Sequence, residues 1–375
     1  MGKESSTVSR RGFLKFAGKT AAVSAAFLSG CAQTALQSAG RSAGGPASAI
    51  DIHHHYVPNS LLEEAKSHGK TLGVEFTDTD GQKALSFAGS PKFVLQRELS
   101  VVDERLKMMQ DCKLAVAALE AHTATLGYRL TGEQGESWCR VYNEGIKELV
   151  TRHPDRFVGI ASVPLQDAAR AAKVLEHAVR DLKLNGGYIG TNVNGNYYNS
   201  TDFDPFWAKA QELDALIVMH PEDVAGSEKM GPYGLRLICG NPADSALSLG
   251  FMTYSGVFDR FPNLKLCVLH GGGFFPYHLG RFDQGWAVRS GPRAAQAKKP
   301  PSGYLKNIYY DDMIYRVDTI DYLRKLAGAD HIMVGTDYPF TLGDWKAVEK
   351  IEALDCPDSE KELMLEGNAK RLLKL

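Results

Sequence analysis

The 375-residue sequence has almost no net charge and few cysteines. It carries 43 Lys and Arg against 44 Asp and Glu, so it lacks the basic surplus of a nucleic-acid-binding protein. Its six cysteines are widely spaced and form no C-x-x-C pair, which argues against a disulfide framework and against a cysteine zinc site. Histidine is also sparse, at 11 residues, so the positions of the histidines are informative.

The N-terminal residues predict an export signal. Residues 9–15 contain Arg10 and Arg11 and resemble a twin-arginine signal, and an alanine-rich apolar stretch follows at residues 16–27. That stretch is short and is interrupted by Lys19, so it does not predict a permanent membrane-spanning helix. The alternative is an ordinary N-terminal helix with a chance Arg-Arg pair.

A lipid-attachment site is expected where this signal ends. Residues 28–31 resemble a bacterial lipobox, in which Cys31 becomes the lipidated first residue after cleavage. We therefore expect residues 1–31 to be a signal peptide and residues 32–48, rich in Ala, Ser and Gly, to be a flexible tether. The mature protein would be anchored by its lipid on the periplasmic side, at the outer membrane.

The remaining residues, 49–375, alternate short apolar runs with helical stretches. The apolar runs predict eight strands, near residues 51, 115, 158, 188, 217, 266, 309 and 334. Eight strand–helix units predict an α/β fold of the (β/α)8 TIM-barrel type, whose active-site residues lie at the C-terminal ends of the strands. A doubly wound sheet is the alternative. Residues 61–96 have no sustained period and predict a small insertion of helix and hairpin over the mouth of the site.

Three consecutive histidines stand at the end of the first predicted strand. On an extended chain His53 and His55 project to one side and His54 to the other, and neutral imidazole is a common ligand of divalent metals. A chelate needs three or four ligands. The ends of three other predicted strands supply further candidates, which are His220, His270 and Asp337. The alternative for the histidine run alone is a solvated surface cluster.

These residue types suit a hydrolytic or lyase metal site. Three imidazoles and a carboxylate can hold one divalent ion and leave a position for water, whose pKa the ion lowers toward neutrality. His270 precedes three glycines and is a better general base than a fourth ligand, because a proton acceptor must stand beside that water. The alternative for His270 alone is a structural histidine beside a glycine turn.

Several short motifs resemble the amidohydrolase superfamily. They are residues 50–55, 218–221, 270–281 and 335–340, and they occur in the order and at the strand ends that the barrel requires. The closest branch is similar to the 2-amino-3-carboxymuconate-6-semialdehyde decarboxylases, and the likeness runs from about residue 50 to the C-terminus. It implies one divalent ion, with zinc usual in that group and manganese frequent in relatives that decarboxylate aromatic acids.

The resemblance also implies roles for individual residues. The metal ligands would be His53, His55, His220 and Asp337. Asp337 would also be catalytic, and His270 would be the general base. Arg281 matches an arginine that reaches across a homodimer interface to a substrate carboxylate, and Arg97 is the nearest match to a second substrate-binding arginine.

The implied activity is that of a metal-dependent decarboxylase, a carbon–carbon lyase acting on a small unsaturated or aromatic carboxylic acid, with His270 activating water on the ion. One alternative is a hydrolase that opens a lactone or amide with the same residues. Another is a lipid-anchored binding protein without chemistry. The sequence departs from the decarboxylases at Glu222, where an aromatic residue is common, and at residues 315–318, which replace a His-Asp-Pro phrase.

Overall fold

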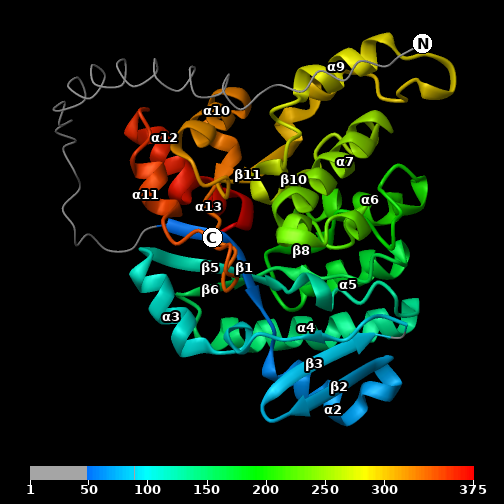
Figure 1. Ribbon diagram of the computed structural model, residues 1–375, viewed down its shortest axis with the longest axis vertical. Helices are drawn as coiled ribbons and strands as arrows, with labels where there is room; N and C mark the ends of the chain where they lie inside the picture. The colour runs from blue at the N-terminus through cyan, green and yellow to red at the C-terminus, as the bar shows by residue number, and fades with distance from the viewer. Residues whose placement is uncertain (1–48, 88) are drawn as a thin grey trace, which may run out of the picture. The chain divides into compact units, whose positions relative to one another are not determined.

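The barrel strands form two parallel sheets that meet along two seams (Figure 1). The computed structural model describes residues 49–87 and 89–375. One sheet has the order β1-β5-β6, and the other has the order β12-β11-β10-β9-β8-β7. Their bounds are β1 (Ala49–Tyr56), β5 (Leu114–Ala121), β6 (Phe157–Gly159), β7 (Ala161–Ser162), β8 (Gly186–Gly190), β9 (Leu216–His220), β10 (Lys265–Val268), β11 (Ile308–Asp311) and β12 (Ile332–Met333).

Backbone contacts join the two sheets at both seams. At the first seam, β6 and β7 are one strand interrupted at Ile160, whose N–H donates to the Leu119 carbonyl at 2.8 Å. At the second seam, Asp51 of β1 pairs in parallel with Val334, and the Ile52 N–H donates to the Val334 carbonyl at 2.9 Å. With β6 and β7 counted together, eight parallel strands follow one another around the fold. The predicted (β/α)8 barrel is therefore confirmed.

Helices follow the strands and lie around the sheets (Figure 1). Two of them begin with residues that favour a helix start: α4 has a capping box between Thr131 and Gln134, and α6 has Pro205 in its first turn. The helices after the insertion are α3 (Val102–Asp111), α4 (Gly132–Arg152), α5 (Ala168–Arg180), α6 (Asp204–Glu212), α7 (Asn241–Tyr254), α8 (Val257–Arg260), α9 (Leu279–Val288), α10 (Val317–Ala327), α11 (Ala347–Glu352), α12 (Asp358–Glu362) and α13 (Asn368–Leu373).

The segment after β1 forms a helix and a small antiparallel sheet. These elements are α2 (Asn59–Leu72), β2 (Val74–Thr79), β3 (Gln82–Phe87) and β4 (Phe93–Val94). The β2–β3 hairpin turns at Asp80 and Gly81, which both have positive φ. The predicted insertion of helix and hairpin is therefore confirmed. The ring of Phe93 stacks on His122 at 6.1 Å, which brings the insertion to the edge of the site described below.

Two helical stretches in the C-terminal half are interrupted. Residues 241–260 are divided into α7 and α8 near Gly256, whose φ of 74° is left-handed and ends a helix. Residues 358–373 contain a π-helical turn, Leu363–Gly367, between α12 and α13.

The described residues begin at Ala49. The predicted signal peptide, Cys31 and the predicted tether therefore lie outside them. Among the helices of the described part of the chain, none combines the length and the apolar character needed to cross a bilayer.

Candidate metal centre and catalytic cavity

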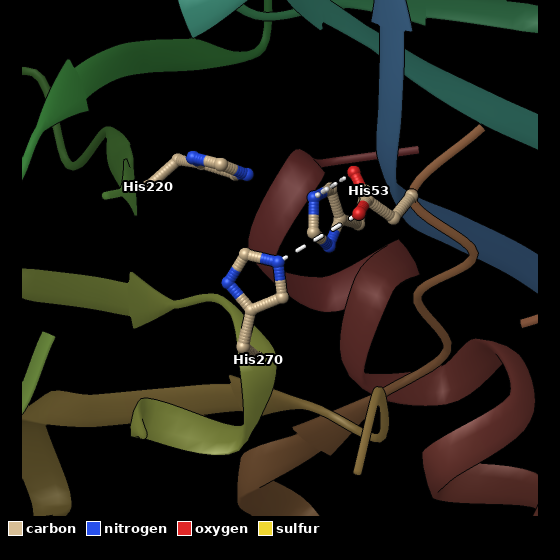
Figure 2. A group of neighbouring side chains, drawn as sticks. His53, His220 and His270 are labelled. Carbon is tan, nitrogen blue, oxygen red and sulfur yellow. Dashed lines mark ion pairs between the residues drawn. The ribbon is translucent and has the colours of Figure 1, made fainter. Parts of the chain in front are cut away.

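Four imidazole rings converge at the C-terminal ends of the barrel strands. His53 and His55 come from β1, His220 ends β9, and His270 follows β10. The ring centroid of His53 lies 5.1 Å from that of His55, 5.2 Å from that of His220 and 5.0 Å from that of His270. Figure 2 shows the rings of His53, His220 and His270 turned toward one another. Residues from three separate parts of the sequence thus meet at one point.

A buried network behind β1 fixes the strand that carries two of these rings. His54 does not join the cluster, and its Nδ1 lies 2.8 Å from Asp51 Oδ2 while its ring stacks on Tyr338. The buried Arg105 guanidinium donates to the His55 carbonyl at 2.9 Å and lies over the Tyr338 ring. These contacts hold the backbone of β1 from the side opposite to the cluster.

Hydrogen bonds also fix which nitrogen of each ring faces the centre. His55 Nδ1 donates to the Ala121 carbonyl at 3.0 Å, and His220 Nδ1 donates to the Pro221 carbonyl at 2.7 Å. Because a carbonyl oxygen only accepts, the neutral rings carry their proton on Nδ1 and present the Nε2 lone pair to the centre. This is the tautomer that a metal ligand requires.

Asp337 supplies a carboxylate to the cluster from the loop after β12. Its Oδ1 lies 3.1 Å from His53 Nε2 and 3.0 Å from His55 Nε2, and its Oδ2 lies 3.8 Å from His270 Nε2. Burial alone would raise the pKa of Asp337, but the charge of His53 and the neighbouring His270 hold that pKa well below its usual range. Asp337 is therefore ionised near neutral pH.

His270 stands on a glycine turn that brings it against α7. An added Cβ at Gly273 would lie 2.0 Å from the Pro242 carbonyl oxygen, so only glycine permits this approach. His270 itself has a left-handed φ of 56°. Its Nδ1 is buried and has no hydrogen-bond partner in the part of the chain that the structure describes. His270 is therefore held close to Asp337 and keeps one nitrogen free.

Two further carboxylates belong to the cluster and were not predicted. Asp311 Oδ2 accepts from His53 Nδ1 at 2.7 Å, and its Oδ1 accepts the Gly271 N–H at 2.7 Å. Glu120 is fully buried, and neither of its carboxylate oxygens has a hydrogen-bond partner within residues 49–87 and 89–375. Asp311 ends a predicted strand and Glu120 follows one directly, so the strand-end rule that singled out the histidines would also have found these two residues.

The residues present fit a divalent metal ion. Ligand atoms of His53, His220, His270 and Asp337 lie within 4.8 Å of one another, and so do ligand atoms of His53, His55 and Glu120. Among the described residues His53 Nε2 makes no hydrogen bond, although Asp337 Oδ1 lies 3.1 Å away. The structure thus brings together all five residues that the sequence placed at the centre. Which of them bind the ion stays a prediction.

A cavity of about 810 Å³ opens above this cluster. His220, His270 and Asp337 form its floor.

We use the name inner wall for the floor residues and the buried groups beneath and beside them, which are His53, His55, Glu120, His220, His270, Asp311 and Asp337. We use the name mouth for the outer lining residues Glu222, Arg236, Leu237, Ile238, Tyr315 and Leu342. The cavity therefore joins a polar floor to a largely apolar entrance.

Arg236 is the only Lys or Arg that lines this cavity among the described residues. It begins the π-helical turn Arg236–Gly240 before α7, and its guanidinium donates to the Glu222 carbonyl oxygen. Burial, and then the charge of Asp223, raise the pKa of the Glu222 carboxyl to about 7. The mouth thus carries one fixed positive charge beside an acid whose charge is readily lost.

His122 lines the cavity beside Phe93 and Phe340. Its Nδ1 accepts the Ala124 N–H at 3.0 Å, which assigns the proton of the neutral ring to Nε2. Burial, and then the nearby His55, lower the pKa of His122 to about 3. His122 is therefore a neutral hydrogen-bond donor near neutral pH.

Neither of the two predicted substrate-binding arginines lines this cavity. Arg97 is exposed and forms an ion pair with Glu104. Arg281 lies on α9 and lines a separate cavity, together with His278 and Arg289. Their predicted roles are not tested by this geometry.

Comparisons with known proteins agree with the barrel and its cluster. A family model described as amidohydrolase matches residues 50–375. The 2-amino-3-carboxymuconate-6-semialdehyde decarboxylase of Dictyostelium discoideum is 28% identical, with 87% of this chain and 91% of the relative covered. The gamma-resorcylate decarboxylase of a Polaromonas species is also 28% identical, with 74% and 89% covered.

Solved structures share the fold. The 5-carboxyvanillate decarboxylase of Sphingomonas paucimobilis has a TM-score of 0.75 at 23% identity, with 88% of this chain and 99% of that chain covered. A dihydroxybenzoic acid decarboxylase of a Polaromonas species, solved with bound manganese, has a TM-score of 0.71 at 23% identity, with 88% and 97% covered. Since the family model spans the whole barrel, from β1 to the last residue, this chain belongs to the amidohydrolase family.

Proposed function

We propose that this chain is a metal-dependent decarboxylase, a carbon–carbon lyase acting on a small aromatic or unsaturated carboxylic acid. The observation that carries the proposal is the cavity floor, where His220, His270 and Asp337 face one enclosed space directly above His53. The curated relatives named above are decarboxylases, which favours lyase chemistry over hydrolysis of a lactone or amide.

The proposed ligands of one divalent ion are His53, His55, His220 and Asp337. When bound, the ion would act as a Lewis acid toward substrate or water oxygen. Zinc suits a set of imidazoles with one carboxylate, and it is the expected ion. Manganese is the alternative, because solved neighbours of this fold contain it.

His270 is the proposed proton carrier. Decarboxylation breaks the bond between the carboxylate carbon and its neighbour, and the neighbouring carbon must gain a proton as carbon dioxide leaves. His270 stands on the cavity floor, and Asp337 Oδ2, 3.8 Å from its Nε2, would stabilise its protonated form. Asp337 is thus proposed to act both as a ligand and in catalysis.

The mouth supports a substrate with a single carboxylate. Leu237, Ile238 and Leu342 give it an apolar surface that suits an aromatic or unsaturated carbon skeleton. Arg236 would attract the incoming carboxylate. A second carboxylate would lie near Glu222 and be repelled whenever Glu222 is ionised.

The test is product analysis on a panel of aromatic and unsaturated acids. The full chain, loaded with zinc or manganese, should release carbon dioxide and the matching decarboxylated product, identified by mass spectrometry. His270→Asn should release almost none. His68→Asn, which changes an exposed histidine of α2 outside this cavity, is the matched control and should retain the rate. Products of water addition without carbon dioxide would favour the hydrolase, and binding without any product would favour a non-catalytic role.

We also propose the localisation and the oligomeric state that the sequence predicts, which are export with lipid anchoring at Cys31 and a homodimer. Changing Arg10 and Arg11 together to Lys should leave the precursor in the cytoplasm, whereas Arg41→Lys should not affect export.

A homodimer in which Arg281 serves the partner's cavity is supported by the position of Arg281 outside its own cavity. Mixing Arg281→Ala with His270→Asn subunits should then restore activity in the hybrids.

A further inference from the structure

Glu120 is the least satisfied charged group of the described residues around the candidate metal centre. Its side chain is 0% exposed, and both of its carboxylate oxygens lack a hydrogen-bond partner. Asp311, by contrast, is bonded to His53 and to the Gly271 N–H. Burying an unpaired carboxyl group costs free energy in either protonation state, so a group left this way needs a partner that the protein itself does not provide.

The neighbouring imidazoles do not satisfy Glu120. Its Oε1 lies 3.6 Å from His55 Nδ1, but that nitrogen already donates to the Ala121 carbonyl. Oε1 also lies 3.9 Å from His53 Nε2, beyond hydrogen-bond distance. The hydroxyl of Tyr188, whose ring lies 6.3 Å from the rings of His55 and His220, is likewise buried without a partner. Several unsatisfied polar groups therefore surround the same centre.

The sheet register places Glu120 level with the histidines. Glu120 of β5 is the parallel ladder partner of His55 of β1. Ligand atoms of Glu120, His53 and His55 lie within 4.8 Å of one another. A cation bonded to His53 and His55 would therefore come within reach of Glu120.

We propose that Glu120 is a fifth protein ligand of the divalent ion, which it would reach from β5. This inference rests on the proposed function only in requiring that the chain binds such an ion. An ion at this position would satisfy both an orphaned carboxylate and the orphaned Nε2 of His53. It would also offset the negative charge that Asp337 and Glu120 bring together in a buried space.

The test measures binding of Mn²⁺ and of Zn²⁺ alone to the full chain. Glu120→Gln keeps the shape of the side chain and removes its charge. It should lower the affinity for both ions by at least the roughly 10- to 100-fold that loss of an outer partner costs. Asp312→Asn is the matched control, because Asp312 is also fully buried at a strand end but belongs to neither ligand group. Its affinity should equal that of the wild type.

Two further readouts separate a ligand from a purely structural residue. Metal-free Glu120→Gln should unfold at the same temperature as the metal-free wild type or higher, because it no longer buries an acid, while the increase in Tm caused by the ion should shrink. In the cobalt-substituted protein, loss of a ligand should increase the intensity of the visible absorption bands. If Glu120→Gln does not fold, Glu120→Asp retracts the carboxylate by one methylene and serves for the same measurements.

Unchanged affinity and unchanged cobalt spectra in a folded Glu120 variant would overturn the assignment and leave the proposed function intact. Binding of two ions by the wild type, with only one lost in the variant, would also overturn it, because Glu120 would then serve a separate ion. Failure of the wild type to bind Mn²⁺ or Zn²⁺ would overturn both proposals together.

Discussion

The inner wall and the mouth of the cavity are built in different ways. In the inner wall, His53 and His55 are fully buried and each ring is oriented by a hydrogen bond from Nδ1. In the mouth, Leu237 is 47% exposed and Ile238 is 58% exposed, and the backbone around them is irregular. The inner wall is thus held by burial and hydrogen bonds, whereas the mouth has exposed apolar side chains on irregular backbone. We infer that the residues at the strand ends determine the type of reaction and that the loop residues determine which substrate is accepted.

Removing a ligand from the inner wall should have the largest effect. Asp337→Ala, like His220→Ala, should abolish both metal binding and turnover, since losing one ligand weakens the whole chelate. Metal content after dialysis and carbon dioxide release are the measurements. Asp318→Ala, an exposed acid on α10, should change neither. Full metal occupancy in the Asp337 and His220 variants would contradict the assignment of the inner wall.

His270→Asn should separate catalysis from metal binding within the inner wall. Turnover should fall on the order of 10²- to 10⁴-fold, the usual contribution of general acid–base catalysis. Metal content should stay that of the wild type, because His270 is not one of the four proposed ligands. If the variant loses its ion, His270 is a ligand, and the proton must be carried by another group.

Asp311→Asn should have an intermediate effect. It weakens the hydrogen bond that orients His53, and such outer partners contribute roughly 10- to 100-fold to metal affinity. Competition with a chelator measures the change. Asp321→Asn, which changes an acid of α10 that pairs with Arg324 and does not line the cavity, is the control. Equal affinity in both variants would mean that packing alone orients His53.

Substitution in the mouth should have the smallest effect. Arg236→Gln should raise KM by about two- to fivefold with little change in kcat, because an exposed charge contributes only about 0.2–1 kcal/mol. The effect should fade at high salt. Arg152→Gln, which changes an exposed arginine of α4 that does not line the cavity, is the control and should leave KM unchanged. A large fall in kcat for Arg236→Gln would mean that the mouth takes part in the chemistry.

Much of the barrel and of the cluster followed from local sequence. Apolar runs that end in His220 and His270 are visible without a structure. This is because a strand and the residue that ends it can be recognised from a few adjacent positions. Glu120 was missed although it also follows an apolar run, because an acid after a strand is usually solvated. Its burial depends on the pairing of β5 with β1, which no local pattern records.

The mouth could not be predicted for the same reason. Arg236 reaches Glu222 across irregular backbone, so their contact depends on tertiary packing. Arg97 was assigned by similarity, but its pairing with Glu104 is set by the short turn before α3. The sequence predicted residue types at strand ends more reliably than partners in loops.

The backbone of His270 and Asp337 has a consequence for how this chain can evolve. Both residues have left-handed φ values, 56° and 57°, which cost a non-glycine residue about 1–3 kcal/mol. A lineage that no longer needed the two side chains would gain thermostability by drifting to glycine or asparagine there. Histidine and aspartate at these positions therefore carry a conformational cost that glycine would not. At these two positions, a substitution that raises the stability of the fold is expected to lower turnover.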